Sequence, residues 1–135
     1  MGKKKVHEFR RSWNITPDPL SKNNTYHPIN IKIYKDIPRE NIPNTESLKD
    51  TYDRVFPYFK KEVLNKLEDN KNILISAHGN SLRAMCKYLF KLDEIKITRL
   101  EIPTGNPLFI SFNDNNEIIK CHYLDKERAK DLIAF

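Results

Sequence analysis

The residues of this sequence best suited to chemistry are His78, Gly79 and Asn80, which lie where an apolar run meets an amphipathic run. The apolar run, Ile73–Ile75, is typical of a buried strand, and the amphipathic run, Leu82–Leu92, has apolar residues at spacings of three and four, as in a helix. Ligands collect at the carboxyl ends of strands in open α/β sheets, and helix N-termini attract anions. The pattern therefore predicts an anion site centred on His78.

Each residue of this group offers a different chemical function. The His78 imidazole can donate to a phosphoryl oxygen, carry a phosphoryl group, or act as acid or base, and the alternative is a histidine satisfied in a polar loop. Gly79 lets a ligand approach the backbone, and Gly79 and Asn80 add hydrogen-bond donors. We expect Asn80 or Ser81 to cap the helix that follows.

The adjacent arginines Arg10 and Arg11 form a second candidate group. Guanidinium groups match phosphate and carboxylate with paired hydrogen bonds, although an adjacent arginine pair is more often solvated surface. The other histidines, His7, His27 and His122, lack a comparable setting, and we expect structural or surface roles for them. Because the sequence has no metal-ligand cluster, Walker loop or dinucleotide fingerprint, phosphate chemistry has to depend on arginine and histidine.

Length and composition indicate one domain, residues 1–135, in the cytoplasm. The chain has 135 residues, 39% of them hydrophobic, and no apolar run of the length that a membrane span needs. Its first residues carry charge without the apolar core of a secretory signal. The two cysteines, Cys86 and Cys121, lack metal or redox spacing, so we expect free thiols in a reducing compartment.

The net charge of +6 favours an anionic partner, which could be nucleic acid, a phosphorylated metabolite or an acidic lipid. The lysines are scattered, apart from Lys3–Lys5, and no RNA-binding aromatic motif or zinc-finger spacing is present. A lysine-rich solvated surface is therefore favoured over a nucleic-acid or membrane partner.

The first half of the chain is expected to be mostly irregular. Helical spacing ends near Trp13, and residues 14–45 hold five of the eight prolines. A helix then starts with a capping-box pattern at Ser47 and Asp50, is kinked at Pro57, and ends at 69–70. Its expected apolar face consists of Leu48, Tyr52, Val55, Phe56, Phe59, Val63 and Leu67.

After the central segment the sequence predicts strands. Residues 97–102 are expected to form a strand or its approach, and 103–107 a turn with strong breakers. Residues 108–112 and 117–124 alternate as the two strands of a hairpin. Asp125 is expected to cap a last short helix over 126–133. The order of elements indicates an α/β fold.

Five motifs together resemble one family. They are FRRSW at Phe9–Trp13, ESLKDT at Glu46–Thr51, AHGNSLR at Ala77–Arg83, IPTGNP at Ile102–Pro107 and HYL at His122–Leu124. In this order, over nearly all of residues 5–130, they resemble the C-terminal half of cofactor-dependent phosphoglycerate mutase, a branch of the histidine phosphatase superfamily. AHGNSLR alone is shared by related histidine phosphatases, whereas the whole series is specific to the mutase branch.

The resemblance implies a three-layer α/β/α fold and interconversion of 3-phosphoglycerate and 2-phosphoglycerate in glycolysis and gluconeogenesis. The family works through a phosphohistidine primed by 2,3-bisphosphoglycerate and needs no metal. By resemblance, His78 is the second active-site histidine, which stabilises the phosphoryl group in transfer. Gly79 and Asn80 then contact the substrate, and Arg10 and Arg11 clamp its carboxylate and phosphate.

Several family features do not occur in this sequence. The RHGE motif with the phosphorylated histidine, the acid/base glutamate and the first strands are absent, and Asn106 stands where the family has an apolar residue. We therefore expect the C-terminal portion of a mutase-like domain, with the N-terminal part of the sheet missing and little activity unaided. It would pair with a second copy or with a separate N-terminal half. The alternatives are one half of a split enzyme, a non-catalytic phosphoglycerate-binding remnant, and a basic nucleic-acid-binding protein.

Overall fold

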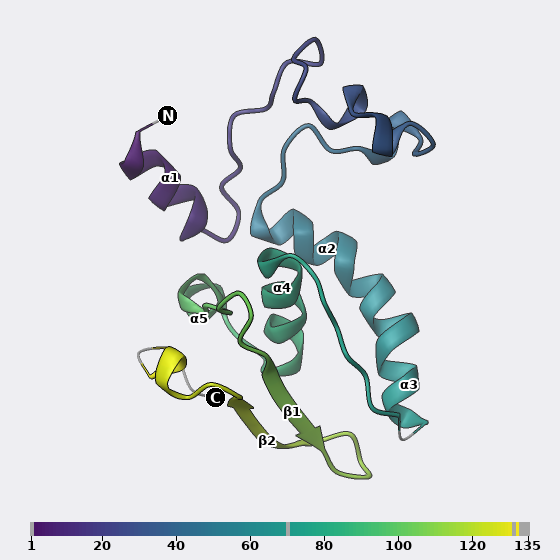
Figure 1. Cartoon of the computed structure of the whole chain (residues 1–135), viewed down its shortest axis with the longest axis vertical. Coiled ribbons are helices and arrows are strands. Elements are labelled where there is room, and N and C mark those ends of the chain that lie inside the picture. Colours follow the sequence, from purple (N-terminus) through teal and green to yellow (C-terminus); the bar gives the residue numbers. More distant parts are fainter. Residues whose placement is uncertain (1, 70, 131, 133–135) are drawn as a thin grey trace. The chain divides into compact units, whose positions relative to one another are not determined.

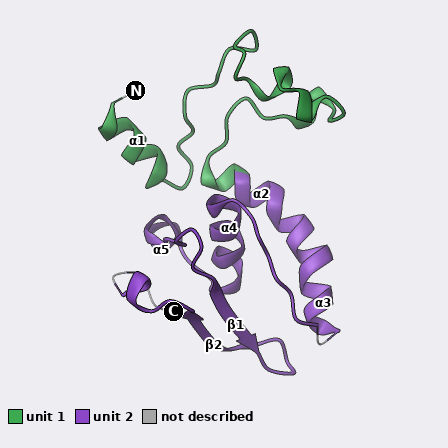
Figure 2. Ribbon diagram, viewed as in Figure 1, with its two compact units in different colours: residues 1–50 green, residues 51–135 purple. Residues whose placement is uncertain are grey.

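The computed structural model describes residues 2–69, 71–130 and 132, and the chain divides into two compact units (Figures 1 and 2). Unit 1 comprises residues 1–50, and unit 2 comprises residues 51–135. The sequence-based expectation of one domain over residues 1–135 stays a prediction.

In unit 1 an N-terminal α-helix is followed by a long irregular segment. Helix α1, Lys3–Arg10, ends before Trp13, as expected, and residues 14–45 form only three 3-10 turns, Pro28–Asn30, Lys32–Tyr34 and Arg39–Asn41. His27 organises this segment from a fully buried position. Its Nε2 lies 3.1 Å from Asn44 Oδ1, and its Nδ1 accepts a hydrogen bond from the Ile29 N–H at 3.3 Å. The prediction of a structural role for His27 is confirmed.

The predicted capping box is present at the start of α2, Leu48–Tyr58. Asp50 Oδ2 accepts from the Ser47 N–H at 2.9 Å and from the Ser47 hydroxyl at 2.6 Å, while the Asp50 N–H donates to Ser47 Oγ at 3.1 Å. These bonds satisfy donors that a helix N-terminus otherwise leaves without partners.

The helix that α2 begins changes form along its length. Pro57 lies within α2, where it cannot donate to the carbonyl four residues back, and a π-helical turn, Phe59–Leu64, follows before α3, Asn65–Glu68. The seven residues of the expected apolar face are all buried or half-buried. In unit 2 the Tyr88 ring lies 4.7 Å from the Phe56 ring and 6.3 Å from the Phe59 ring, between centroids, so α2 and the π-helical turn pack on α4.

Helix α4, Gly79–Leu89, confirms the amphipathic run, but the next predicted strand is wrong. Residues Glu94–Arg99 form helix α5 instead of a strand. Asp93 explains the difference, because its Oδ1 accepts from the Lys96 N–H at 2.7 Å and so caps a helix start. One face of this short helix is buried at Ile97, which is fully shielded from solvent.

The predicted hairpin is confirmed. Strand β1, Leu108–Phe112, pairs antiparallel with β2, Ile118–Tyr123, with Leu108 opposite Tyr123 and a register shift between Ser111 and Phe112. Tyr123 is buried, and its hydroxyl donates to the Glu101 carbonyl at 2.6 Å. Burial raises the pKa of Tyr123 to about 12, so this hydroxyl stays a donor at neutral pH.

The predicted strand at Ile73–Ile75 is wrong for the described residues. Residues 71–78 run without strand structure from α3 to α4 (Figure 1), and Leu74 is 91% exposed. Within the described part of the chain, the backbone of 72–77 makes no hydrogen bond. A strand needs a neighbour to pair with, and in the part of the chain that the structure describes β1 and β2 pair only with each other. The structure therefore has helices and a small antiparallel sheet, in agreement with the α/β class.

Asn106 joins the turn before β1 to the residues after β2. It is 2% exposed, its Nδ2 donates to the Asp125 carbonyl and its Oδ1 accepts from the Asp125 N–H, both at 2.9 Å. Arg128 donates to the carbonyls of Thr104 at 2.8 Å and Gly105 at 3.3 Å. Asp125 Oδ1 also accepts from the Arg128 N–H at 3.0 Å, within the 3-10 stretch Glu127–Ala129, whose N-cap residue is Lys126. Residues 131 and 133 of the predicted helix lie outside the described residues.

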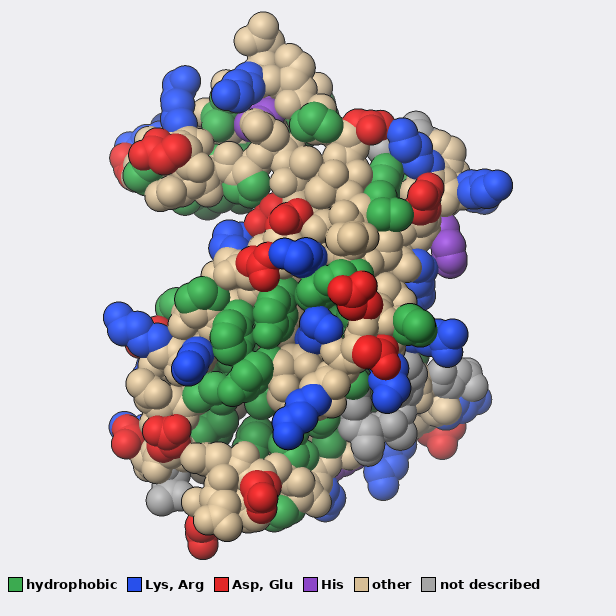
Figure 3. All heavy atoms as spheres, turned by 180° about the vertical axis from the view of Figure 1, so that it is seen from behind, with side chains coloured by type: hydrophobic (Ala, Val, Ile, Leu, Met, Phe, Trp, Pro, Cys, Tyr) green, Lys and Arg blue, Asp and Glu red, His purple; other side chains and the backbone are tan. Residues whose placement is uncertain are grey.

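Unit 2 has an open groove of about 820 Å³, lined by apolar residues and by polar or charged ones, which are Glu68, Lys87, Lys91, Asn116 and Glu117. Figure 3 shows hydrophobic side chains gathered at the surface in the lower part of the view. The apolar residues of the groove come from the helical segment 48–68, from α4 and the turn after it, and from the hairpin. They are Tyr52, Leu64, Leu67, Tyr88, Leu89, Leu92, Phe112 and Ile118. The small sheet therefore leaves part of this apolar surface open.

The capping box predicts a pH-dependent stability difference. Hydrogen bonds from the Ser47 hydroxyl and N–H hold the pKa of Asp50 below its usual value. Because the folded-state pKa is lowered, the stabilisation is present above the unfolded value of about 3.9 and is lost as pH falls through the folded value. Asp50→Asn should therefore have a lower urea midpoint than wild type at pH 7, and this gap should close toward pH 3. Asp114→Asn, in the exposed hairpin loop, is the control; a gap that stays constant in acid contradicts the prediction.

The hydrogen bonds of Asn106 predict that an apolar residue at this position, as the family has, makes this chain less stable. Asn106→Val leaves the N–H and carbonyl of Asp125 without their partner, which should lower the free energy of unfolding by about 2 kcal/mol. Urea denaturation measures this change. Asn115→Val, at the exposed hairpin tip, should change it by less than about 0.5 kcal/mol. Equal stabilities for Asn106→Val and wild type would show that this side chain does not hold the two segments together.

Candidate anion-binding site at the start of α4

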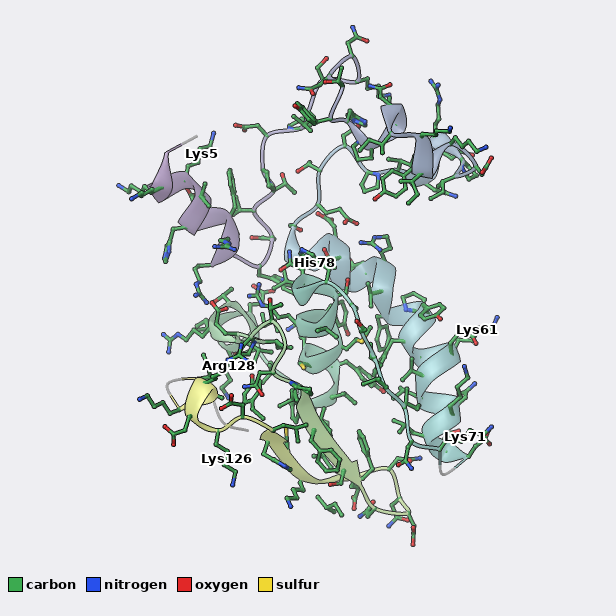
Figure 4. All side chains as sticks on the ribbon, in the orientation of Figure 1. Lys5, Lys61, Lys71, His78, Lys126 and Arg128 are labelled. Carbon is green, nitrogen blue, oxygen red and sulfur yellow. The ribbon has the colours of Figure 1, made fainter. Side chains whose placement is uncertain are left out.

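His78 is the N-cap residue of α4. Its backbone is extended, with φ −62° and ψ 144°, and its ring Nδ1 accepts a hydrogen bond from the Asn80 N–H at 3.3 Å. The prediction that Asn80 or Ser81 caps this helix is therefore wrong. The helix begins at Gly79, so Asn80 lies inside its first turn and the cap is the imidazole of His78, which Figure 4 labels.

The capping bond determines which nitrogen of His78 is a donor. A neutral imidazole has one N–H and one acceptor nitrogen, and Nδ1 is the acceptor here. The hydrogen is therefore on Nε2. Because the His78 side chain is exposed, Nε2 can donate to an oxygen of an incoming anion.

Gly79 and Asn80 surround this donor with open space and polar groups. A Cβ on Gly79 would meet no atom within 4 Å, so packing does not require a glycine there and the backbone is open to a ligand. The start of an α-helix also carries a partial positive charge from its unpaired N–H groups. Asn80 is exposed on the same first turn.

Arg83 is a residue of this site that the sequence reasoning quoted within a motif without assigning it a role. Its Nη1 donates to Asn80 Oδ1 at 3.3 Å, and its Nη2 donates to the Ile97 carbonyl at 2.7 Å. A signal was present in the sequence, because residues three apart on a helix lie on one face. The second bond, to α5, could not be foreseen while residues 97–102 were expected to be a strand.

The predicted arginine pair lies in unit 1. Arg10 is the last residue of α1, and Arg11 caps its C-terminus through N–H bonds to the carbonyls of His7 at 3.0 Å and Glu8 at 3.2 Å. Arg10 also lines a hollow of about 300 Å³ with Lys3, Val6 and His7. The approach of Arg10 and Arg11 to His78 stays a prediction.

Other reactive groups are poorly suited to chemistry. Burial raises the pKa of Cys86 to about 12 and raises that of Cys121, so both free thiols stay protonated at neutral pH. Across residues 2–69, 71–130 and 132 there is no group of three or more histidine, cysteine or acidic side chains that could hold a metal ion. In the same residues no helix has the length and apolar character of a membrane span.

Comparison with known proteins places these residues in a family. Residues 22–124 match the histidine phosphatase superfamily (branch 1), which is more than half of the chain. The chain is also 63% identical over 135 residues to a protein of Pelagibacter ubique (strain HTCC1062), and 46% identical over 131 residues to one of Hyphomonas neptunium (strain ATCC 15444). Both relatives are named 2,3-bisphosphoglycerate-dependent phosphoglycerate mutase.

The matches include nearly the whole of this chain but only part of each relative. They cover 100% and 97% of the chain, and 57% and 54% of the two relatives, so the chain spans about half the length of the curated relatives that it matches. The resemblance found from the five motifs is thereby confirmed, and the chain belongs to the histidine phosphatase superfamily (branch 1).

Proposed function

We propose that this chain supplies the His78 side of a phosphoglycerate mutase active site, which interconverts 3-phosphoglycerate and 2-phosphoglycerate and depends on 2,3-bisphosphoglycerate. The names of the relatives support the reaction. The observation that carries the proposal is the His78 cap, because the Nδ1 bond to Asn80 makes Nε2 the donor at an exposed helix start.

The groups at this helix start suit a phosphorylated acid. The Nε2–H of His78 donates to a phosphoryl oxygen, and it stabilises negative charge that develops on that oxygen during transfer. The Asn80 side-chain NH₂ and the helix N-terminus add donors, and no carboxylate occurs between His78 and Arg83 to repel the ligand. Arg10 and Arg11 are proposed to bind the carboxylate and phosphate of the same ligand.

This set of donors also fits 2,3-bisphosphoglycerate. When bound, it supplies the phosphoryl group that primes the enzyme. His78, Gly79 and Asn80 would hold its phosphate through N–H groups, and the proposed clamp of Arg10 and Arg11 would supply the compensating positive charge. Because the RHGE motif and the acid/base glutamate do not occur in this sequence, both are proposed to come from the part of the relatives that this chain does not match.

The part of the relatives that this chain does not match is also proposed to complete the sheet of a three-layer α/β/α fold. Residues 72–77 have no backbone hydrogen-bond partner among the described residues, and Leu74 is exposed, although the sequence of Ile73–Ile75 is typical of a buried strand. A strand from the remaining part, in the same polypeptide or in a separate one, would pair with them. The expected cytoplasmic location and a homodimer stay predictions.

The capping bond gives a spectroscopic prediction. In the neutral state His78 should be the Nε2–H tautomer, because its Nδ1 accepts from the Asn80 N–H. The ¹⁵N chemical shifts of the ring report which nitrogen carries hydrogen. The exposed His7, which has no such cap at α1, is the control and should show a mixture of tautomers. The Nδ1–H form of His78 would contradict the proposed donor role.

The proposed function predicts turnover that depends on His78. A chimaera that joins the unmatched N-terminal part of the Pelagibacter ubique relative to this chain should convert 3-phosphoglycerate in the presence of 2,3-bisphosphoglycerate. The 135-residue chain alone should not. His78→Gln in the chimaera should lower kcat by about 100-fold or more, since a donor to the transferring group is lost.

The control for this assay is His7→Gln, which should leave the rate unchanged because His7 is an exposed residue of α1 without a proposed role. Turnover by the chain alone would show that it needs no second half. A folded chimaera without turnover, or one that is unaffected by His78→Gln, would refute the proposed function.

A further inference from the structure

We propose that Arg83 is a positioning residue that fixes the carboxamide of Asn80, so that the NH₂ group of Asn80 faces the anion bound beside His78. The proposal rests on the proposed function for the identity of that anion, a phosphoglycerate. It assigns a role to a residue outside the set predicted from the sequence.

The chemistry of arginine determines which way the Asn80 side chain points. Arg83 Nη1 lies 3.3 Å from Asn80 Oδ1. A guanidinium has only donors, so it can bond the oxygen of a carboxamide but not its NH₂ group. The bond therefore directs Oδ1 toward Arg83 and turns Nδ2, with its two hydrogens, away from the guanidinium.

Arg83 is itself held in place by a second bond. Its Nη2 donates at 2.7 Å to the carbonyl of Ile97, a fully buried residue in the last turn of α5, and its Nε is shielded from solvent. The bonded carbonyl is one of those that the end of a helix leaves unpaired. Because the guanidinium fork is planar and rigid, anchoring one nitrogen restricts the other, and the position of α5 is transmitted to Asn80.

An unrestrained Asn80 would bind an anion less well. The side chain is exposed at the start of α4, and a free carboxamide would present its oxygen about as often as its NH₂ group. The oxygen repels phosphate and carboxylate, whereas the NH₂ group donates to them. If the NH₂ group is already fixed toward the ligand, the free energy of orienting the carboxamide is not lost when the anion binds.

The positive charge of Arg83 is a competing explanation, since any cation near the site attracts an anion. Arg83→Lys separates the two, because lysine keeps the charge but lacks the fork that bonds Asn80 and Ile97 together. If charge alone mattered, Arg83→Lys would behave as wild type and Arg83→Gln would not. If positioning matters, both variants should be impaired.

The first measurement follows Asn80 directly. In ¹⁵N-labelled protein the side-chain NH₂ of Asn80, identified by its loss in Asn80→Ala, should have the high order parameter of a fixed group. This order should be lost in Arg83→Lys and Arg83→Gln. Arg99→Gln, which removes an exposed arginine of α5, is the matched control and should leave the Asn80 signal unchanged.

The second measurement is a double-mutant cycle on the affinity for 3-phosphoglycerate, by calorimetry on the chain and through KM in the chimaera. Arg83→Lys and Asn80→Ala should each weaken binding by about tenfold, as for a lost hydrogen bond to a charged group, with kcat changed less than about twofold. The double variant should bind no worse than Asn80→Ala alone, since Arg83 acts through Asn80.

The outcomes separate the two proposals. Additive effects of the two substitutions, or an Asn80 NH₂ group that stays ordered in Arg83→Lys, would overturn the positioning role while leaving the proposed function intact. Absence of phosphoglycerate binding by wild-type chain and chimaera alike would refute the proposed function, and the role of Arg83 in ligand binding with it. Loss of Asn80 order together with non-additive affinities would support the positioning role.

Discussion

The site in this chain depends on one hydrogen bond, from the Asn80 N–H to His78 Nδ1. It ends the extended stretch, starts α4 and determines the tautomer of the imidazole. A single contact thus couples the local backbone to the chemistry of the ring, because a histidine that caps a helix cannot offer Nδ1 to a ligand. The Arg83 bonds extend this order from the backbone of α4 to the Asn80 side chain and to α5.

The family relationship concerns the whole domain of the relatives, whereas the structure shows which elements form in this chain. The comparisons place the chain among histidine phosphatases, and the relatives are about twice as long as the matched region. The structure of unit 2 keeps the helices and the hairpin but has no central sheet in its described residues. Local hydrogen bonds and helix packing suffice to form the helices and the hairpin, whereas parallel strands require neighbours that are distant in sequence.

How well each element could be predicted follows from this distinction. The capping box at Ser47, the hairpin at 108–123 and the motif around His78 carry local signals, and the sequence reasoning identified them. The strand expected at Ile73–Ile75 depends on pairing, so its apolar residues alone could not produce it. At residues 97–102 the β-branched residues suggested a strand, but the Asp93 cap favoured α5. The spacing of Asn80 and Arg83 carried a signal for their bond within α4, whereas the bond of Arg83 to the Ile97 carbonyl joins two helices and could not be read from local sequence.

Leu74 is exposed and, as far as the described residues go, the backbone of 72–77 makes no hydrogen bond, which bears on how such a chain behaves in a crowded cell. An extended apolar stretch with free donors and acceptors is the kind of sequence that molecular chaperones bind and that cross-β fibrils recruit. A stretch of this kind is open both to chaperones that hold non-native chains and to strand pairing between copies of the same sequence.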